Sequence, residues 1–415
     1  MKFYLFISGF FLWASAAFTQ IPQTSPPDYI RTIQFKGNQT YNGVPLIKLG
    51  QGFSFEFDDL IGDEADYYYK ISYYNFDWTP TQLAKNEYLE GMDRLRIKNY
   101  SNSFNTLQIY THYQLNLPNT DTKALKVSGN YLLEIYDAKD RLVFSKPFIL
   151  YEDSTPIEVE IKRSRDLKYL NTRQVVNFSI HNPKGLALKN PDQNLQVLLL
   201  QNQNLSTARS GFKPQYRTGS KLVYRYDQET AFEGGNEYLF FDSKDVRATA
   251  NNIQRSHLDD IYNLYIYPDA PRSQLPYTYN PDINGGYQIN TVHGSDSSVE
   301  SEYVWVHFSL KGDFQPEGEV HLYGSFNDYR VEASTLLTYQ SKTDSYEGKY
   351  LFKQGFYNYK YVLLTSDGQL NEGYFSGNFD KTENQYTVLA YYRDPGARYD
   401  RIIGMGEANS EQISN

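Results

Sequence analysis

The alternation of hydrophobic and polar residues predicts a chain made almost entirely of β-strands. Residues 67–73 have apolar side chains at every second position, which is typical of a strand with one buried face, formed here by Tyr67, Tyr69, Ile71 and Tyr73. A second strand is predicted over residues 107–117, where one face carries Leu107, Ile109, Tyr113, Leu115 and Leu117. Strands of this kind recur along the chain, so the sequence predicts an all-β fold of tandem immunoglobulin-like β-sandwich domains.

A long polar insertion separates these two strands. Residues 77–80 predict a turn, and residues 82–90 predict about two turns of helix that end at Gly91. An insertion of this length between paired strands either binds a partner or packs over the sheet. Trp78 leaves the same choice open, because a tryptophan serves either as an anchor at a protein interface or as a cap on the core of a sandwich.

The strands group into three domains and a tail, in line with a length of 415 residues. The first domain spans residues 28–152 and ends in a polar break that closes with Pro156. The second spans residues 157–296, has its central strand at residues 195–200, and leaves through a proline-rich crossing at residues 268–281. The third spans residues 299–393. Residues 394–415 form a tail that is predicted to be mobile after Gly406.

Several sequences in order along the chain resemble one family of exported proteins. They are Asn75-Phe-Asp-Trp-Thr-Pro, Asn86-Glu-Tyr-Leu-Glu-Gly, Ser103-Phe-Asn-Thr-Leu, Ser128-Gly-Asn-Tyr-Leu-Leu, Gly234-Gly-Asn-Glu-Tyr, Tyr303-Val-Trp-Val-His-Phe and Arg398-Tyr-Asp-Arg. The chain thereby resembles the type IX secretion system plug proteins of Bacteroidetes. The resemblance implies a periplasmic protein at the inner face of the outer membrane. There it would close the periplasmic opening of the giant translocon barrel (SprA/Sov-type) by protein–protein binding, as a monomer within the complex.

The third domain carries a second resemblance. Val304, Val306, Phe308 and Leu310 form one apolar face of a strand, and Asp367-Gly368 predicts a hairpin. Gly324-Ser-Phe-Asn and Tyr357-Asn-Tyr-Lys-Tyr are similar to early-set immunoglobulin-like modules related to glycogen-binding domains, although Tyr329 stands where those modules often have tryptophan. This resemblance implies an alternative function, a periplasmic protein that binds carbohydrate such as glucan.

Composition narrows the class of protein. The 40 tyrosines are explained either by packing of β-sheets or by a large recognition surface. A net charge of -9 argues against a nucleic-acid partner. The absence of cysteine excludes disulfides, cysteine-ligated zinc, a cysteine nucleophile and a lipidated cysteine anchor.

The beginning of the chain predicts export. Residues 1–19 have the pattern of a secretory signal peptide, with Lys2, an apolar core at residues 3–13 and small residues at 15–17. No later stretch is apolar over the length of a membrane-spanning helix. We therefore expect a soluble periplasmic protein with no direct membrane insertion.

Motifs for catalysis are missing, so the sequence predicts no enzyme, no cofactor and no metal. It contains no Gly-x-Ser-x-Gly elbow and no phosphate-binding loop. The six histidines lack the close spacing of a zinc site; they are His112, His181, His257, His293, His307 and His321. Residues 282–286 begin like a calcium loop but lack its later ligands, and a turn is the better interpretation.

The insertion and the tail are the candidate contact surface for a protein partner. The candidate residues are Asp77, Trp78, Asn86, Glu87, Tyr88, Arg398, Tyr399 and Arg401. If they act as anchors, Trp78→Ala and Tyr88→Ala weaken association with the partner without unfolding the protein.

Overall fold

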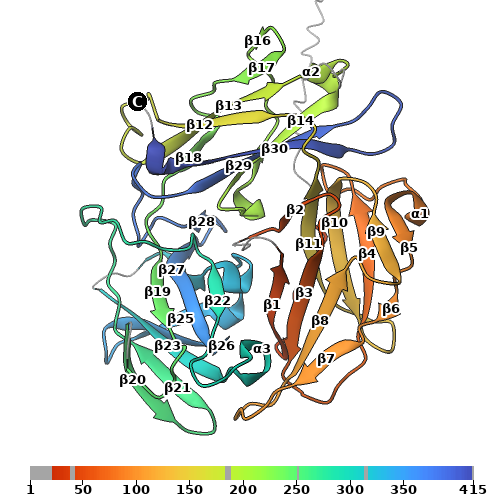
Figure 1. Ribbon diagram of the computed structural model, residues 1–415. Coiled ribbons are helices and arrows are strands. Elements are labelled where there is room, and N and C mark those ends of the chain that lie inside the picture. The colour runs from red at the N-terminus through yellow and green to blue at the C-terminus, as the bar shows by residue number, and fades with distance from the viewer. Residues whose placement is uncertain (1–20, 38–42, 183–187, 250–251, 313–315, 414–415) are drawn as a thin grey trace, which may run out of the picture.

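The computed structural model describes residues 21–37, 43–182, 188–249, 252–312 and 316–413. Figure 1 shows three bodies: the first domain in red and orange, the second in yellow-green with dark blue strands, and the third in green to blue. Each is built from β-strands, so the predicted all-β fold of tandem sandwich domains is confirmed. The predicted signal peptide at residues 1–19 lies outside the described residues. Among the described helices, none combines the length and apolar character needed to cross a membrane.

The first domain is a sandwich of two main sheets. One sheet has the order β1 (Ile30–Lys36), β3 (Phe53–Asp59), β8 (Thr111–Leu117), β7 (Asn99–Asn102). The other has the order β2 (Leu46–Lys48), β11 (Leu142–Tyr151), β10 (Gly129–Tyr136), β4 (Tyr68–Tyr74), β6 (Leu95–Arg96). A small additional sheet pairs β5 (Leu89–Gly91) with β9 (Thr122–Leu125), next to the short helix α1 (Lys85–Tyr88).

The two strands on either side of the insertion have the predicted periodicity, but they are not paired with each other. Tyr69 and Ile71 of β4 and Tyr113 of β8 are buried in one core, as the alternation predicted. The strands are not paired, however, because β4 and β8 lie in opposite sheets. Strand β8 begins only at Thr111, and the predicted helix is reduced to the four residues of α1.

The second domain places a sheet of five strands against one of four. The first contains β12 (Ile157–Arg163), β13 (Arg173–His181), β17 (Lys221–Tyr224), β16 (Tyr216–Thr218) and β18 (Ala231–Glu233). The second has the order β15 (Arg209–Ser210), β14 (Leu195–Gln201), β29 (Gln385–Tyr392), β30 (Arg401–Asn409). The one described α-helix of this domain is α2 (Pro191–Asn194).

Strand β14 is central, as its apolar run predicted, and it serves two cores. Val197 and Leu199 pack into the core of the second domain, whereas Leu198 and Leu200 pack on the other face against Leu46 of the first domain. Both faces of the sheet are therefore covered, which explains why β14 is apolar at nearly every position.

The third domain is one sheet that bends around its own core. The order is β19 (Leu239–Asp242), β27 (Gly355–Thr365), β24 (Gly318–Tyr323), β25 (Leu336–Gln340), β26 (Ser345–Lys353), β23 (Tyr303–Lys311), β21 (Tyr262–Ile266), β20 (Ile253–Leu258). Short strands β22 (Tyr287–Ile289) and β28 (Leu370–Asn371) also pair with β27, and α3 (Ser297–Glu300) precedes β23. Leu264 of β21 and Tyr359 of β27 share one buried cluster, although their strands lie far apart in the order.

Sheet pairing crosses the predicted boundaries of the second and third domains. Residues 239–266, assigned to the second domain, form β19, β20 and β21 of the third sheet. Strand β29 at the end of the predicted third domain, and β30 in the predicted tail, complete the sheet around β14. Strand β30 continues to Asn409 and Ser410 is buried, so the chain remains part of the second domain beyond Gly406. Strand pairing over nearly 200 residues leaves no local pattern, so the sequence alone did not reveal it.

A fully buried ion pair joins the first domain to the third. The Nζ atom of Lys353 lies 2.6 Å from Oδ2 of Asp58, and both side chains are almost completely inaccessible to solvent. Asp58 also accepts a hydrogen bond from the hydroxyl of Tyr303 and pairs with Nδ1 of His112, each at 2.6 Å. Burial alone would raise the pKa of Asp58, but Lys353 and His112 hold that pKa below its ordinary value, so the carboxylate is ionised.

Loss of one partner of the ion pair should destabilise the protein much more than loss of both. We expect Lys353→Met to cost about 3–5 kcal/mol of stability, because Asp58 then keeps a buried charge without its partner. The double variant Asp58→Asn/Lys353→Met should recover most of this loss. Denaturant unfolding of both variants measures the effect, with the exposed Lys342→Met as control. Equal midpoints for Lys353→Met and Lys342→Met would show that the pair contributes little.

Candidate functional site

The fold brings the two predicted groups of contact residues together. Glu87 of α1 forms an ion pair with Arg398, which lies in the connection between β29 and β30. The guanidinium of Arg398 also donates a hydrogen bond to the carbonyl oxygen of Gln82 at 3.4 Å. Insertion and tail therefore form one continuous surface, although more than 300 residues separate them in the sequence.

The two aromatic residues of the insertion are part of the core rather than of this surface. Trp78 is only 2% exposed and packs against Tyr74, with ring centroids 6.0 Å apart. Tyr88 is 6% exposed, lies 5.6 Å from the ring of Tyr73, and has its pKa raised by burial to about 12. The structure thus favours the interpretation of Trp78 as a residue that caps the sandwich.

Local hydrogen bonds explain how the insertion is held. The carboxylate of Asp77 accepts hydrogen bonds from the N–H and the hydroxyl of Thr79, at 3.1 and 2.6 Å, which closes the turn around Trp78. The carboxylate of Glu87 accepts a hydrogen bond from the N–H of Ala84 at 2.7 Å, at the start of α1. Asn86 is exposed, and its carbonyl oxygen accepts a hydrogen bond from Lys126 at 2.8 Å.

The remaining candidates stabilise the contact between the first and second domains. The ring of Tyr399 is half-buried beside Tyr73, with centroids 6.2 Å apart. Arg401 lies 3.4 Å from Glu152 and 3.2 Å from Asp394. Of the eight candidates, Asn86 and Arg398 are exposed, and Asp77, Glu87, Tyr399 and Arg401 are half-buried. A role of these residues in partner binding stays a prediction.

Asp400 is a key residue of this region that the sequence did not single out. Its carboxylate accepts hydrogen bonds from the guanidinium of Arg393, at 2.8 and 2.7 Å, and from the N–H of Phe76 at 3.0 Å. The backbone carbonyl oxygen of Asp400 accepts a hydrogen bond from the hydroxyl of Tyr73. The Arg398-Tyr-Asp-Arg sequence marked this site, but only the fold shows that its aspartate faces the first domain.

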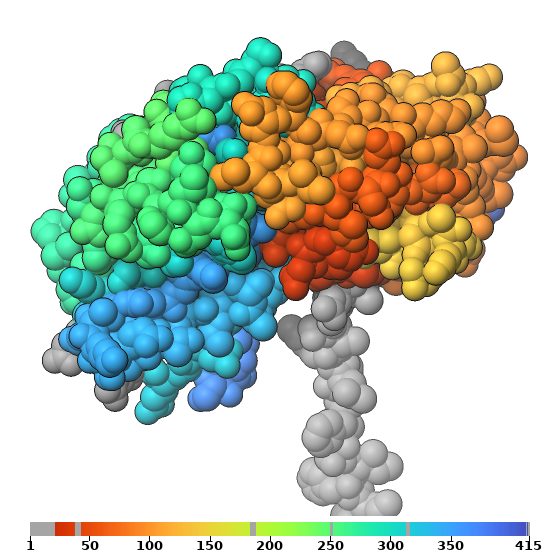
Figure 2. Space-filling view, turned by 90° about the horizontal axis from the view of Figure 1, so that it is seen from below, coloured from red at the N-terminus to blue at the C-terminus, as the bar shows by residue number. Residues whose placement is uncertain are grey.

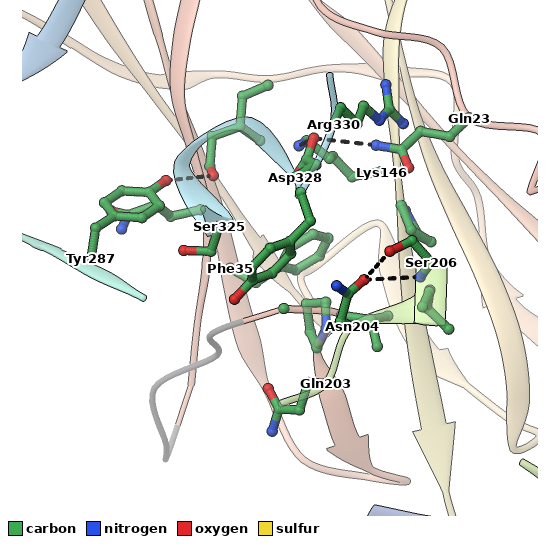
Figure 3. Close-up of a pocket in the computed structure, with 18 of the residues that line it drawn as sticks. Gln23, Phe35, Lys146, Gln203, Asn204, Ser206, Tyr287, Ser325, Asp328 and Arg330 are labelled. Carbon is green, nitrogen blue, oxygen red and sulfur yellow. Dashed lines mark hydrogen bonds and ion pairs between the residues drawn. The ribbon is translucent and has the colours of Figure 1, made fainter. Parts of the chain in front are cut away.

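A cavity of about 1220 Å³ lies where the three domains meet (Figure 3). Asp328 of the third domain forms an ion pair with Lys146 of the first and accepts a hydrogen bond from Gln23 at 3.5 Å. The hydroxyl of Tyr287 donates to the carbonyl oxygen of Ile33 at 3.1 Å. In the second domain, the side-chain oxygen of Asn204 accepts hydrogen bonds from the N–H and the hydroxyl of Ser206, and both residues line the cavity. The wall holds paired charges and hydrogen bonds between domains, and its described lining residues include no histidine.

The buried carboxyl group of Glu237 lies beside the proline-rich crossing, near the half-buried carboxyl group of Asp282. The carboxyl of Glu237 accepts hydrogen bonds from the Tyr277 hydroxyl and from the N–H of Glu383. Burial raises the pKa of Glu237 to about 7, and the neighbouring charge of Asp282 adds to this effect against the two hydrogen bonds. The predicted turn at residues 282–286 is confirmed, since the carboxylate of Asp282 accepts a hydrogen bond from the N–H of Asn284 at 2.6 Å. In the described parts of the chain, no three His, Asp or Glu side chains are arranged to hold a metal ion.

Tyr329, the residue on which a glucan platform would depend, is buried. It is 6% exposed, its ring lies 5.4 Å from that of Tyr323, and its hydroxyl donates to the carbonyl oxygen of Asn284 at 3.1 Å. A sugar ring needs an exposed aromatic face, and Tyr329 does not offer one.

Comparison with known proteins agrees with the resemblance of the first domain. Residues 30–152 match the family model described as the type 9 secretion system plug protein 1st domain. The crystal structure of a hypothetical protein from Parabacteroides merdae is 29% identical and aligns with a TM-score of 0.88. The alignment covers 93% of this chain and 98% of that one, so the arrangement of all three domains is shared.

More distant comparisons add nothing to this. The BSP domain of a biofilm associated protein is 7% identical, with a TM-score of 0.17 over 93% of this chain and 59% of that chain. None of the curated proteins matches this chain significantly.

Truncations should separate the buried from the exposed candidates. We expect Trp78→Ala to cost about 3–5 kcal/mol, because it leaves a cavity under the insertion. The Arg398→Ala variant should cost less than about 1 kcal/mol, because its ion pair with Glu87 is exposed. Thermal unfolding of the two variants tests this difference. A Trp78→Ala variant as stable as Arg398→Ala would contradict the core role of Trp78.

The buried carboxyl group should make stability depend on pH. The folded-state pKa of Glu237 lies above its ordinary value of 4.5, so the stabilisation by its protonated form is complete at low pH and is lost as pH rises through about 7. Glu237→Gln keeps a neutral side chain and should match the wild type near pH 4, below the unfolded-state pKa, but exceed it by about 1–3 kcal/mol near pH 8.5. Unfolding midpoints at the two pH values measure this. The exposed Glu229→Gln should show no such difference.

Proposed function

We propose that this protein, whose first domain is that of the type IX secretion system plug proteins, closes the periplasmic opening of a giant outer-membrane barrel. It binds the barrel as a folded plug and is displaced when a substrate or carrier engages. The match of residues 30–152 to the plug family carries the proposal. The protein from Parabacteroides merdae supports it, because a fold shared over 93% of this chain indicates that the three domains are kept together as one unit.

The contacts between domains suit a plug, because a plug must resist deformation by the channel that it blocks. The Asp58–Lys353 pair joins the first and third domains through buried charges. The hydroxyl of Tyr391, on the second-domain sheet, donates to Asn130 of the first domain at 2.8 Å. Between these two domains lies an apolar cluster that includes Leu46 and Leu198. Movement of one domain against another would expose these groups to water.

The proposed location is the periplasm, at the inner face of the outer membrane. The signal-peptide pattern of residues 1–19 supports export, and the absence of cysteine removes a lipid anchor on that residue. The proposed partner is the barrel protein, bound by one copy of this chain. Catalysis has no support in the candidate site, where the charged side chains are engaged in contacts within and between domains.

The glucan-binding alternative loses its supporting residue, because Tyr329 is buried. The exposed members of the insertion and tail remain the contact residues that the sequence proposes. Asn86 and Arg398 can be altered without disturbing the core, since both face solvent.

Capture of the partner tests the proposal. Full-length protein with a C-terminal tag should recover a very large outer-membrane barrel from membranes of cells that carry the secretion system, most strongly when no export substrate is present. Because the chain has no cysteine, Asn86→Cys and Leu167→Cys each introduce one thiol for cross-linking. We expect a cross-link to the barrel from position 86 and none from position 167, an 86% exposed site in the second domain.

Two failures would have different meanings. Recovery of no barrel, with an intact translocon and with an internal tag also tried, would overturn the plug function. Recovery of the barrel without a cross-link from position 86 would leave the plug function in place and would show that the surface formed by α1 and Arg398 does not contact the barrel.

A further inference from the structure

Four large hydrophobic side chains stand exposed together at one end of the first domain. We call this group the apolar tip; its members, with their exposed fractions, are Ile61 (51%), Phe104 (68%), Leu107 (48%) and Ile109 (59%). Leu107 and Ile109 were predicted to lie on the buried face of a strand. They lie instead in a loop that precedes β8, so that strand prediction is wrong for these two residues. Figure 2 shows the face that carries this loop, where orange residues of the first domain stand beside the green part of the third.

The loop is closed at its base by hydrogen bonds. The N–H of Ser103 donates to the carbonyl oxygen of Tyr110 at 2.8 Å, and the N–H of Tyr110 donates to Oγ of Ser103 at 3.0 Å. The hydroxyl of Tyr110 donates to the carbonyl oxygen of Ser301 at 3.0 Å. The six residues between Ser103 and Tyr110 therefore project from a fixed base.

Further contacts fix the loop along its length. The N–H of Phe104 donates to the carbonyl oxygen of Val299, and the N–H of Leu107 donates to the carboxylate of Glu302, each at 2.9 Å. The side chain of Gln108 donates to the carbonyl oxygen of Leu60 at 3.1 Å, which holds the loop beside Ile61. The backbone of the apolar tip is thus fixed by two domains, while its hydrophobic side chains face water.

Such an arrangement is typical of a docking surface. Exposed apolar groups that gather on a soluble protein mark interaction sites, whereas isolated ones are common. Here the backbone is already held in place, so binding costs little conformational entropy. The backbone next to Ile61 packs closely against the loop at Gly62. This residue has a positive φ of 69°, and a Cβ atom at its position would lie only 3.3 Å from the side chain of Ile109.

The charges around the apolar tip point to the chemistry of the partner. Asp63 and Glu64 are exposed on the loop that carries Ile61, and no ion pair is formed by either within the described residues. The carboxylate of Glu64 is held in place by hydrogen bonds from the hydroxyl of Tyr100, at 3.2 Å, and from the side-chain amide of Asn102, at 2.5 Å. The carboxylate of Glu302, which accepts the hydrogen bond from the N–H of Leu107, is half-buried; burial raises its pKa, and this hydrogen bond and the charge of Arg247 act against that effect. The rim is therefore acidic on the side of Ile61, where these two carboxylates of Asp63 and Glu64 repel anionic lipid headgroups and favour a protein surface that carries lysine or arginine.

Resting on the plug function proposed above, we propose that the apolar tip docks into an apolar pocket with a basic rim on the barrel protein. The contact would combine burial of Phe104 and Leu107 with attraction between Asp63 or Glu64 and cations of the pocket rim. It lies on loops at the end of the first domain, separate from the surface formed by α1 and Arg398.

Loss of the apolar side chains should abolish docking without harm to the fold. In full-length tagged protein, Phe104→Ser/Leu107→Ser should reduce capture of the barrel by at least about tenfold, since large central side chains carry most of the energy of an interface. Leu167→Ser/Leu275→Ser is the matched control, because these leucines are 86% and 56% exposed in other regions of the chain. It should capture as well as wild type, and both variants should keep the wild-type unfolding temperature.

The charge of the rim provides a second test. Asp63→Lys should also lower capture of the barrel, because the new cation would face those of the pocket. The wild-type protein should not sediment with vesicles of neutral lipid, nor with vesicles that also contain anionic lipid. Sedimentation that is lost in Phe104→Ser/Leu107→Ser would show that lipid occupies the apolar tip, and would overturn the proposal.

The outcomes also distinguish the two proposals. Capture of the barrel by wild type and by Phe104→Ser/Leu107→Ser to the same extent would overturn docking through the apolar tip and leave the plug function intact. Failure of the wild type to capture any barrel would overturn the plug function and this docking mode with it.

Discussion

The buried pair of Asp58 and Lys353 is the constraint on which the relation of the domains depends. Two opposite charges without access to water are tolerated only when each stays next to the other and their remaining hydrogen-bonding positions are filled. Here the carboxylate of Asp58 also forms hydrogen bonds with His112 and Tyr303, and Lys353 donates a further hydrogen bond to the carbonyl oxygen of Ser298 at 2.6 Å. A shift of the first domain against the third by one residue would separate the charges, so the pair fixes one orientation.

A sheet that serves two cores has the same effect between the first and second domains. Strands β14 and β29 bury alternate side chains in the second domain and the others against the first. The chain returns from the third domain to complete this sheet with β29 and β30, so its last strands close the assembly. This closure makes the first two domains one stiff body, as the proposed plug function requires.

Tyrosine supplies much of this construction, which explains its abundance. The rings of Tyr73, Tyr110 and Tyr391 are buried, and each hydroxyl donates a hydrogen bond to another domain, at Asp400, Ser301 and Asn130 respectively. A tyrosine therefore fills a core with its ring and fixes a neighbouring domain with its hydroxyl. Of the two explanations for the tyrosine content, packing accounts for these residues, while the exposed apolar tip uses phenylalanine, leucine and isoleucine.

The sequence by itself determined the local features: the all-β fold, the buried faces of β4 and β23, the central position of β14 and the resemblance of the first domain to the plug family. These follow from periodicity and from motifs, which are properties of neighbouring residues. Only the tertiary structure decided that Trp78 is covered, that Leu107 and Ile109 are not, and that β29 pairs with β14 rather than within the third domain. The physical reason is that burial and strand pairing depend on contacts between residues far apart in the chain. The alternation of apolar and polar residues along a segment is the same whether or not another domain covers its apolar face.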